Sequence, residues 1–366
     1  MNNKFDELTK NLAQSVTQKT KRVNVSKNLF SNYHVLRAAI CVAALIFGYE
    51  ANAQPQFSFA AIGDLPYEPV ANGRQVYPIP PYERLIADIN SDPSIEFTVH
   101  IGDIKAGNTL CEDDVYLNNF AYFNSFQNPL IFTPGDNEWT DCHRANNGSM
   151  DPLERLALIR MLFYDSNKSL GQNPMPLFKD KAPYVENSIW RQRPAMFVTL
   201  NQPGSNNNRN RTTGLFQDPT DSEYTLRNDS NMEFLDKVLH LGHFNPQVKL
   251  VVIASQANPF ERFIEPNQGY TVSGYGDFIE KLRAFVAANP DKEVLYIGGD
   301  THTPRVDHPL TDTYPSPTQL TAAGTPYQNF TRLEVYGQTA AFSRWFKVSV
   351  NLDGTLGTET QIVPSE

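Results

Sequence analysis

Short apolar runs alternate with longer stretches of helical periodicity along the chain from residue 57 onward. The short runs predict strands at 57–62, 96–101, 130–133, 196–200, 249–254, 294–298, 330–336 and 344–351. The longer stretches predict helices at 81–91, 112–126, 151–163, 222–242 and 275–289. This alternation is typical of an α/β architecture. The last two apolar runs follow one another without a helix between them, which favours antiparallel pairing of those strands.

The predicted elements form one continuous series over residues 54–366, with no internal repeat, Gly/Ser linker or heptad run. We therefore expect a single domain over this range. The stretches 202–220 and 303–329 predict long loops, which in a compact domain usually carry function or are disordered. In the first of them, residues 205–208 are Asn-rich and are followed by Arg209 and Arg211. These side chains either donate hydrogen bonds to a phosphate or are simply the polar side chains of a solvent-exposed loop.

Four apolar runs lead into a carboxylate that follows a glycine. They read FAAIGD, FTVHIGD, LIFTPGDNE and VLYIGGDTH, and their aspartates are Asp64, Asp103, Asp136 and Asp300. The carboxyl ends of strands are where α/β sheets build their sites, so we expect the four to share one site. Carboxylates brought that close repel one another unless a cation lies among them. The pattern therefore predicts a site for a pair of divalent metal ions.

Residues 1–53 have the pattern of a secretory signal with a long basic n-region. The apolar stretch 38–48 is too short to span ~30 Å of hydrocarbon, and it follows a series of lysines and arginines. Ala51-Asn52-Ala53 fits a cleavage site that would leave Gln54 as the first mature residue. We therefore expect a secreted or periplasmic protein with no stable membrane span after cleavage. An uncleaved anchor or a buried helix is the alternative interpretation.

The mature chain is acidic. Residues 1–53 hold seven of the 31 basic and three of the 40 acidic residues, which leaves 24 basic and 37 acidic residues and a formal charge of −13. Such a chain has no general electrostatic attraction to nucleic acid or to anionic membranes. Nucleic-acid binding is therefore not expected, and an anionic substrate needs a local cation.

Two of the three cysteines, Cys111 and Cys142, lie in the mature chain, each a few residues after a Gly-Asp step. In an exported protein such a pair is expected to be oxidised. We therefore predict a disulfide that joins two loops of the site. A pair of thiolate metal ligands is the alternative, and it suits the surrounding oxygen donors less well.

The order of these motifs resembles that of the calcineurin-like metallophosphoesterases, whose pattern runs D-x-H, G-D, G-N-H-[D/E], a strand-end His and G-H-x-H. The resemblance extends from Asp64 to the strands beyond His302. It implies a four-layer αββα sandwich of two mixed β-sheets flanked by helices, with metals at the strand ends. It also implies a phosphoesterase that hydrolyses mono- or diesters of a small phosphorylated substrate by a metal-activated hydroxide.

The match to the family pattern is incomplete in its first half. Asp64 fits the first Asp of D-x-H, but Pro66 occupies the His position. Asp103 fits the carboxylate that bridges both metals in the family. In GDNE, Asp136 takes the place of the metal-binding Asn and Asn137 that of the catalytic His, while Glu138 matches.

The second half departs in a similar way. Gln256 falls where a ligand His is expected, and in GDTH Asp300 replaces the first His while His302 keeps the second. The resemblance thus implies one metal held by Asp64, Asp103 and His302, and another held by Asp103, Asp136, Gln256 and Asp300. Because most of these donors are oxygens, we expect manganese, iron or magnesium before zinc.

The resemblance assigns catalytic roles to Asp103, Asn137 and His302. An amide cannot act as a general acid at neutral pH, so Asn137 predicts slow turnover of alkyl esters. Lys105, Arg144 and Asn137 are candidates for binding phosphate. Alternatively, Lys105 and Arg144 pair with nearby aspartates such as Asp141, or the Lys105 ammonium replaces one metal. Tyr67 either fills the space of the missing His or packs.

Two other functions stay open. Pro66, Asn137 and Gln256 replace three family histidines, which fits a catalytically silent binding protein that keeps the fold. A structural Ca²⁺ site with a role in adhesion fits the acidity but explains none of the motif order.

Overall fold

The computed structural model describes residues 55–211, 215–261, 272–313, 324–337 and 342–364. All of them belong to one compact unit, Gln54–Glu366. The predicted signal, residues 1–53, lies outside the described residues. Within the described part of the chain, no helix combines the length and apolar character needed to cross a bilayer.

Five strands form the first sheet, in the order β14-β13-β1-β4-β5. They are Leu356–Ile362 (β14), Arg344–Val350 (β13), Phe57–Ile62 (β1), Ile95–His100 (β4) and Leu130–Phe132 (β5). β1, β4 and β5 are parallel to one another, whereas β13 is antiparallel to both β1 and β14. The parallel strands place the chain segments that follow them at one edge of the sheet.

Seven strands form the second sheet, in the order β11-β12-β10-β9-β8-β7-β6. They are Arg305–Asp307 (β11), Phe330–Glu334 (β12), Glu293–Gly298 (β10), Leu250–Ala254 (β9), Ala195–Thr199 (β8), Ser188–Gln192 (β7) and Phe178–Lys179 (β6). The four central strands, β12, β10, β9 and β8, are parallel. β11 is antiparallel to β12, β7 to β8, and β6 to β7. Two further strands of two residues each, β2 (Val70–Ala71) and β3 (Arg74–Gln75), pair with each other and belong to neither large sheet.

The five longest helices match the predicted ones within three residues at each end. They are α3 (Pro80–Ser91), α4 (Asp113–Phe123), α5 (Pro152–Phe163), α7 (Ser222–Phe244) and α8 (Gly276–Ala288). α5 shows how the sequence sets such a start: Pro152 occupies the first turn, and the Asp151 side chain accepts a 2.9 Å hydrogen bond from the Leu153 amide. Proline and an aspartate cap both favour a helix N-terminus.

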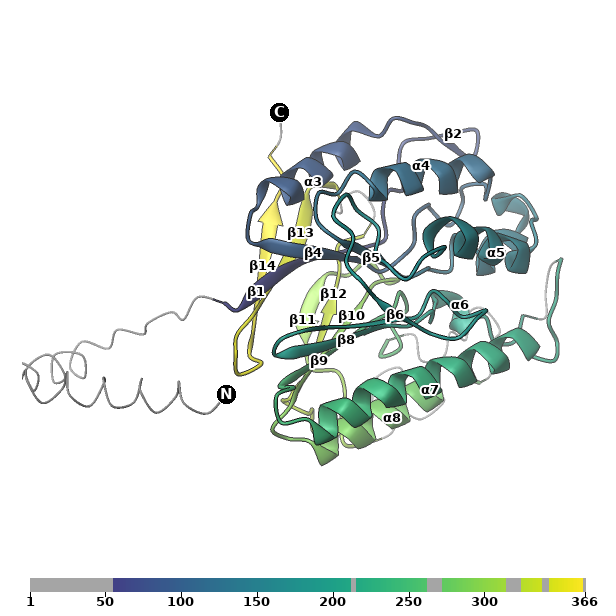
Figure 1. Ribbon diagram of the computed structural model, residues 1–366. Helices are drawn as coiled ribbons and strands as arrows, with labels where there is room; N and C mark the ends of the chain where they lie inside the picture. Colours follow the sequence, from purple (N-terminus) through teal and green to yellow (C-terminus); the bar gives the residue numbers. More distant parts are fainter. Residues whose placement is uncertain (1–54, 212–214, 262–271, 314–323, 338–341, 365–366) are drawn as a thin grey trace, which may run out of the picture. The chain divides into compact units, whose positions relative to one another are not determined.

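The two sheets pack face to face, with helices on both outer sides (Figure 1). Alternate residues of β1 show this directly, because Phe57, Phe59 and Ala61 belong to the core between the sheets. Ala60 and Ile62 instead pack toward α3, α4 and α5. α7 and α8 cover the outer face of the second sheet, and their apolar side chains form a third hydrophobic cluster with it. The predicted αββα sandwich of two mixed sheets is confirmed, and burial of both strand faces explains the continuous apolar runs.

The predicted antiparallel pairing of the last two apolar runs was wrong. β12 lies in the seven-stranded sheet, parallel to β10, whereas β13 lies in the five-stranded sheet. The antiparallel partner of β13 is β14, which has a largely exposed, polar sequence and was not predicted. An edge strand with a solvated face carries too few apolar residues to be distinguished from a loop.

The predicted loop 202–220 is buried over its first half. It contains α6 (Gly204–Asn207), in which Ser205 and Asn206 have positive φ angles of 48° and 55°. Asn206, Asn207 and Asn208 are buried and hydrogen-bonded, so the Asn-rich stretch is not part of a solvent-exposed loop. The second predicted loop, 303–329, includes β11, and residues 314–323 of it lie outside the described residues.

Candidate active site

The aspartates predicted from the sequence lie at the carboxyl ends of strands from both sheets. Asp64 follows β1, Asp103 follows β4 and Asp136 follows β5 in the first sheet. Asp300 and His302 follow β10 in the second sheet. A pocket of about 390 Å³ is lined by Asp103, Asp136, Asn137, Arg144, Asp300 and His302, among others. Strand ends of two facing sheets thus supply one shared site, as the Gly-Asp pattern predicted.

Three side chains form a compact set of metal donors. One ligand atom from each of Asp64, Asp103 and His302 lies within 4.8 Å of the other two. All three have left-handed backbone conformations, with φ angles of 50°, 56° and 55°. Non-glycine residues adopt this conformation at a cost, and such residues cluster at functional sites. Two carboxylates and one imidazole are suitable ligands for a divalent transition metal.

A second group of donors lies beside the first. A Cβ atom on Gly204 would stand 2.5 Å from Asp300 Oδ1 and 2.9 Å from Asp136 Oδ2, so the two carboxylates converge on this glycine. Asp136 Oδ1 is buried and has no hydrogen-bond partner in the described part of the chain. A buried carboxylate oxygen of this kind is costly unless a cation or water satisfies it. Asp136 and Asp300 therefore fit the predicted second metal position.

Gln256 lies next to Asp300, but its amide is oriented by the chain itself. Its oxygen accepts a hydrogen bond from the Gly204 amide, and its nitrogen donates to Asp300 Oδ1 at 3.4 Å. In this orientation the nitrogen, which cannot bind a metal, faces the carboxylate. Gln256 thus reaches the predicted position and positions Gly204 and Asp300 there, whereas acting as a ligand requires its oxygen to turn.

The carboxylates raise one another's pKa. Burial, and next the Asp300 carboxylate, raises the pKa of Asp64 well above its ordinary value. Burial, and next Asp136 and Glu138, does the same for Asp103. This is the behaviour of like charges in a site that lacks enough positive charge. Divalent cations among these groups would favour their ionised forms.

Glu138 holds Asp103 in place. It is fully buried, and its Oε1 accepts hydrogen bonds from the backbone amides of Gly135 at 2.6 Å and Asp103 at 3.1 Å. Burial raises the pKa of Glu138 to about 7, although the Gly135 amide acts in the opposite direction. The two amides tie the GDNE turn to the turn after β4. Glu138 is therefore a positioning residue for Asp103.

Asn137, which stands in the place of the family's catalytic histidine, binds Asp103. Its Nδ2 donates to Asp103 Oδ2 at 2.7 Å, and its backbone amide donates to Asp103 Oδ1 at 3.2 Å. Its Nδ2 also lies 3.3 Å from the Tyr67 hydroxyl. Asn137 lines the pocket, yet its amide is directed to a metal donor. This arrangement orients Asp103 and supplies no acid.

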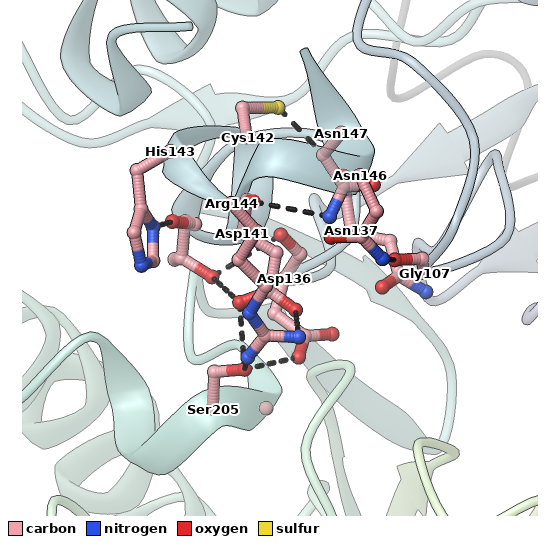
Figure 2. Close-up of polar contacts among 12 residues, drawn as sticks. Gly107, Asp136, Asn137, Asp141, Cys142, His143, Arg144, Asn146, Asn147 and Ser205 are labelled. Carbon is pink, nitrogen blue, oxygen red and sulfur yellow. Dashed lines mark hydrogen bonds and ion pairs between the residues drawn. The ribbon is translucent and has the colours of Figure 1, made fainter. Parts of the chain in front are cut away.

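Arg144 forms the positive wall of the pocket (Figure 2). Its Nη1 pairs with Asp141 Oδ2 at 2.6 Å, and its Nη2 donates to Ser205 Oγ at 3.1 Å. The Ser205 hydroxyl is 2.7 Å from Asp136 Oδ2 and 2.9 Å from Asp141 Oδ1. The chain from Arg144 through Ser205 to Asp136 therefore connects the cation to a predicted metal donor. Arg144 pairs with Asp141, as one alternative predicted, and still faces the pocket.

Lys105 does not line the pocket. Its side chain is fully buried, and its Nζ donates to the Ala106 carbonyl and to Asn147 Oδ1, both at 3.0 Å. Burial lowers the pKa of Lys105 to about 8, although Asp141 and Glu138 act in the opposite direction. The structure thus places this candidate phosphate ligand behind the site, where its charge offsets part of the carboxylate cluster.

The predicted disulfide is confirmed. Cys111 and Cys142 are bonded, with a Cα–Cα distance of 5.8 Å. The bond joins the loop that precedes α4 to the 3₁₀ turn Thr140–His143. The second loop carries Asp141 and leads into Arg144, so the disulfide ties the positive wall to the segment that follows Asp103.

Sequence reasoning did not single out Gly204 and Ser205. The stretch 205–208 was considered only as possible phosphate donors or as polar side chains of a solvent-exposed loop, and its composition did not predict burial beside Asp136 and Asp300. Tyr67 was considered only as a possible replacement for the missing histidine. Its hydroxyl lies 2.8 Å from Asp103 Oδ2 and 3.2 Å from His302 Nε2, so it belongs to the site.

Comparisons with known proteins give structural matches only. No protein-family model and no curated protein matches this chain. A 5'-nucleotidase from Candida albicans SC5314 is similar over 85% of this chain and 53% of its own, with 14% identity and a TM-score of 0.39. PhoD is similar over 84% of this chain and 68% of its own, with 13% identity and a TM-score of 0.46. The chain thus spans about half the length of the 5'-nucleotidase.

Both matched proteins have the calcineurin-like metallophosphoesterase fold. The order of the two sheets and the meeting of five motif residues at their strand ends agree with the resemblance found in the sequence.

Proposed function

We propose that this protein is a secreted, metal-dependent phosphoesterase that hydrolyses small phosphate mono- or diesters. The observation that carries the proposal is the convergence of Asp64, Asp103 and His302 within 4.8 Å. This set opens on a pocket that also presents Asp136, Asp300 and the Arg144 guanidinium. Metal donors, a cation for the phosphoryl oxygens and a pocket of substrate size are the parts that hydrolysis of a phosphate ester needs.

The residues have separate roles in this proposal. Asp64, Asp103 and His302 hold one divalent ion, and Asp103, Asp136 and Asp300 hold a second. When bound, such a pair supplies Lewis acidity and lowers the pKa of a coordinated water. Glu138 and Asn137 fix the orientation of Asp103 through the hydrogen bonds described above. Arg144, held by Asp141 and Ser205, offers its remaining N–H groups to phosphoryl oxygens.

Export from the cytoplasm is part of the proposal. It is supported by the signal-like pattern of residues 1–53 and by the Cys111–Cys142 disulfide, because disulfides persist in oxidising compartments. The acidic mature chain supports a small substrate that is bound by a local cation, and it gives no general attraction to nucleic acid.

The proposal is tested by elemental mass spectrometry on residues 54–366 purified without chelator, followed by a panel of phosphate mono- and diesters. We expect close to two equivalents of manganese, iron or magnesium and hydrolysis of at least one ester class. The Asp103→Asn variant should lose both the metals and the activity. Asp229→Asn, an exposed change on α7, is the matched control and should lose neither.

A silent binding protein is the second candidate, because Asn137 is bound to Asp103 and cannot supply a proton. It predicts the same fold without turnover. Failure to bind manganese, iron, zinc or magnesium, with no hydrolysis of any ester, would reject the enzyme and favour this candidate.

A further inference from the structure

A second pocket of about 460 Å³ lies where the start of α7 meets α5. Its lining includes Leu153, Leu156 and Arg160 from α5, Tyr184 from the loop before β7, and Arg211 and Leu226 from the segment that enters and begins α7. None of its lining residues lines the active-site pocket. We call it the Arg211 pocket.

Arg211 is the unusual residue of this pocket. Its side chain is only 9% exposed, and its Nε and Nη1 atoms are buried without a hydrogen-bond partner in the described part of the chain. Burial lowers the pKa of Arg211, although Glu223 and Asp218 act in the opposite direction. A buried guanidinium with unused donors costs free energy that the chain does not recover from its own described groups.

Other buried arginines in the described part of the chain are fully engaged. Arg227 donates to Glu223 and to the Asn201 and Asn207 oxygens, and Arg332 donates to Asp307 and Asn258. Arg211 therefore differs from them in its lack of an acceptor, not in its burial.

The two carboxylates that line the Arg211 pocket already have other partners. Asp218 accepts hydrogen bonds from the Glu223 amide and the Ser222 hydroxyl. Glu223 accepts from Arg227 and from Asn208. Neither is paired with Arg211, so this guanidinium, which lines the pocket, has no carboxylate partner in the described part of the chain and can accept an oxyanion.

The rim of the Arg211 pocket is apolar. Leu226 is 62% exposed and Leu153 is 46% exposed, and both line the opening. The Tyr184 ring lies beside them, with the Arg160 guanidinium 5.6 Å from its centroid. A cationic floor beneath apolar and aromatic walls fits a ligand with a charged end and a short apolar body.

We propose that the Arg211 pocket binds a small amphipathic oxyanion, with a carboxylate or phosphoryl group on Arg211 and an apolar body between Leu153, Leu226 and Tyr184. The site is separate from the metal centre. It therefore binds its ligand whether or not metals are bound and whether or not the protein hydrolyses phosphate esters.

The test uses isothermal titration calorimetry on residues 54–366 with two probes, phenylphosphonate and benzoate, before and after metal removal with a chelator. We expect saturable binding of one equivalent of at least one probe to the metal-free protein. Arg211→Gln should weaken it by about tenfold or more, since a charge-assisted two-point contact is lost. The control Arg191→Gln removes an exposed arginine that contacts Gln247 and should change nothing.

The two probes separate the sources of the oxyanion. Binding of phenylphosphonate alone assigns the pocket to phosphoryl ligands, and binding of benzoate alone assigns it to carboxylates. Absence of binding of both probes, or equal binding by wild type and Arg211→Gln, overturns the proposal.

A stability measurement tests whether Arg211 serves the fold instead. Arg211→Met keeps the length of the side chain and removes the unused donors, so the ligand-free variant should melt no lower than wild type. Arg227→Met, which breaks a fully engaged buried arginine, should melt several degrees lower. An equal loss in both variants would show that Arg211 holds the structure together and would overturn the proposal.

Discussion

The Tyr67 hydroxyl donates a 2.8 Å hydrogen bond to Asp103 Oδ2 and lies 3.2 Å from His302 Nε2, so one phenol contacts two of the three clustered metal donors. Burial, and next the Asp103 charge, raises the pKa of Tyr67, which keeps the phenol protonated as a donor. Pro66 fills the position of a family histidine in the sequence, and the residue after it contacts the donors instead. Tyr67 is therefore a positioning residue of the proposed metal centre.

We expect Tyr67→Phe to weaken metal binding about 10- to 100-fold, the usual effect of removing a group that orients a ligand. The phenyl ring keeps the edge-on packing against His302, so the melting temperature of the metal-free protein should hardly change. Competition with a metal-binding dye measures the affinity. Tyr77→Phe, which removes a hydroxyl bonded to Gln75, is the control. Equal affinities in wild type and Tyr67→Phe would show that Tyr67 only packs.

Asn137 predicts a strong dependence of the rate on the leaving group. An amide cannot protonate a departing alkoxide, and general acid catalysis contributes about 10²–10⁴ in rate, so aryl esters with acidic leaving groups should react fastest. A plot of log kcat/KM against leaving-group pKa should be steep for wild type. Asn137→Ala removes the 2.7 Å contact to Asp103 and should lower all rates without changing the slope. A flat plot, or faster alkyl esters, would reveal another acid.

Most of the strands that sequence reasoning placed well are buried on both faces. β1, β4, β8, β9 and β10 lie within one residue of their predicted ends, because continuous apolar runs leave no other interpretation. β7 and β14 were missed because their polar residues face solvent or the sheet edge. Each pairs with a strand next to it in the sequence, β7 with β8 and β14 with β13.

The residues of the site also differ in how well a local sequence pattern predicts them. Asp64, Asp103 and Asp136 each follow a strand, so a local pattern was enough to find them. For Ser205 and Arg211 the sequence left a phosphate donor and the polar side chain of a solvent-exposed loop equally open. What decides for Ser205 is its contact with Asp136, 69 residues away, and for Arg211 its lack of a partner in the described part of the chain. Local sequence does not encode which side chains a long segment will bury.

The disulfide should contribute to stability as well as to the site. It closes a loop with a sequence separation of 31 residues, for which the chain-entropy model gives roughly 3–4 kcal/mol. Both sulfurs also lie near the Asn137 carbonyl, at 3.5 and 3.8 Å. We expect the Cys111→Ser, Cys142→Ser double variant to lose stability of that order in urea unfolding and to bind substrate more weakly. Dithiothreitol should reproduce the loss in wild type and have no effect on the variant.

His100 predicts a specific loss of stability in acid. It is fully buried at the end of β4 against Phe123 and Phe132, and its Nδ1 accepts a 3.1 Å hydrogen bond from the Gly102 amide. Burial lowers the pKa of His100 from the ordinary 6.5 to about 3. Between these values the unfolded chain binds a proton that the folded protein does not. The contribution of His100 to the free energy of unfolding is therefore complete above pH 6.5 and falls by up to about 1.4 kcal/mol per pH unit below it.

The variant His100→Asn isolates this contribution, because its side-chain oxygen can accept the Gly102 hydrogen bond and it does not titrate. At pH 8 it should be less stable than wild type by about 1–3 kcal/mol, since it loses ring packing against Phe123. The difference should shrink as the pH falls from 6.5 to 5, because only wild type loses stability through proton uptake at this position. Urea unfolding at four pH values between 5 and 8 measures it. A constant difference across that range would show that His100 is protonated in the folded protein, with a buried acceptor for the second proton on its ring.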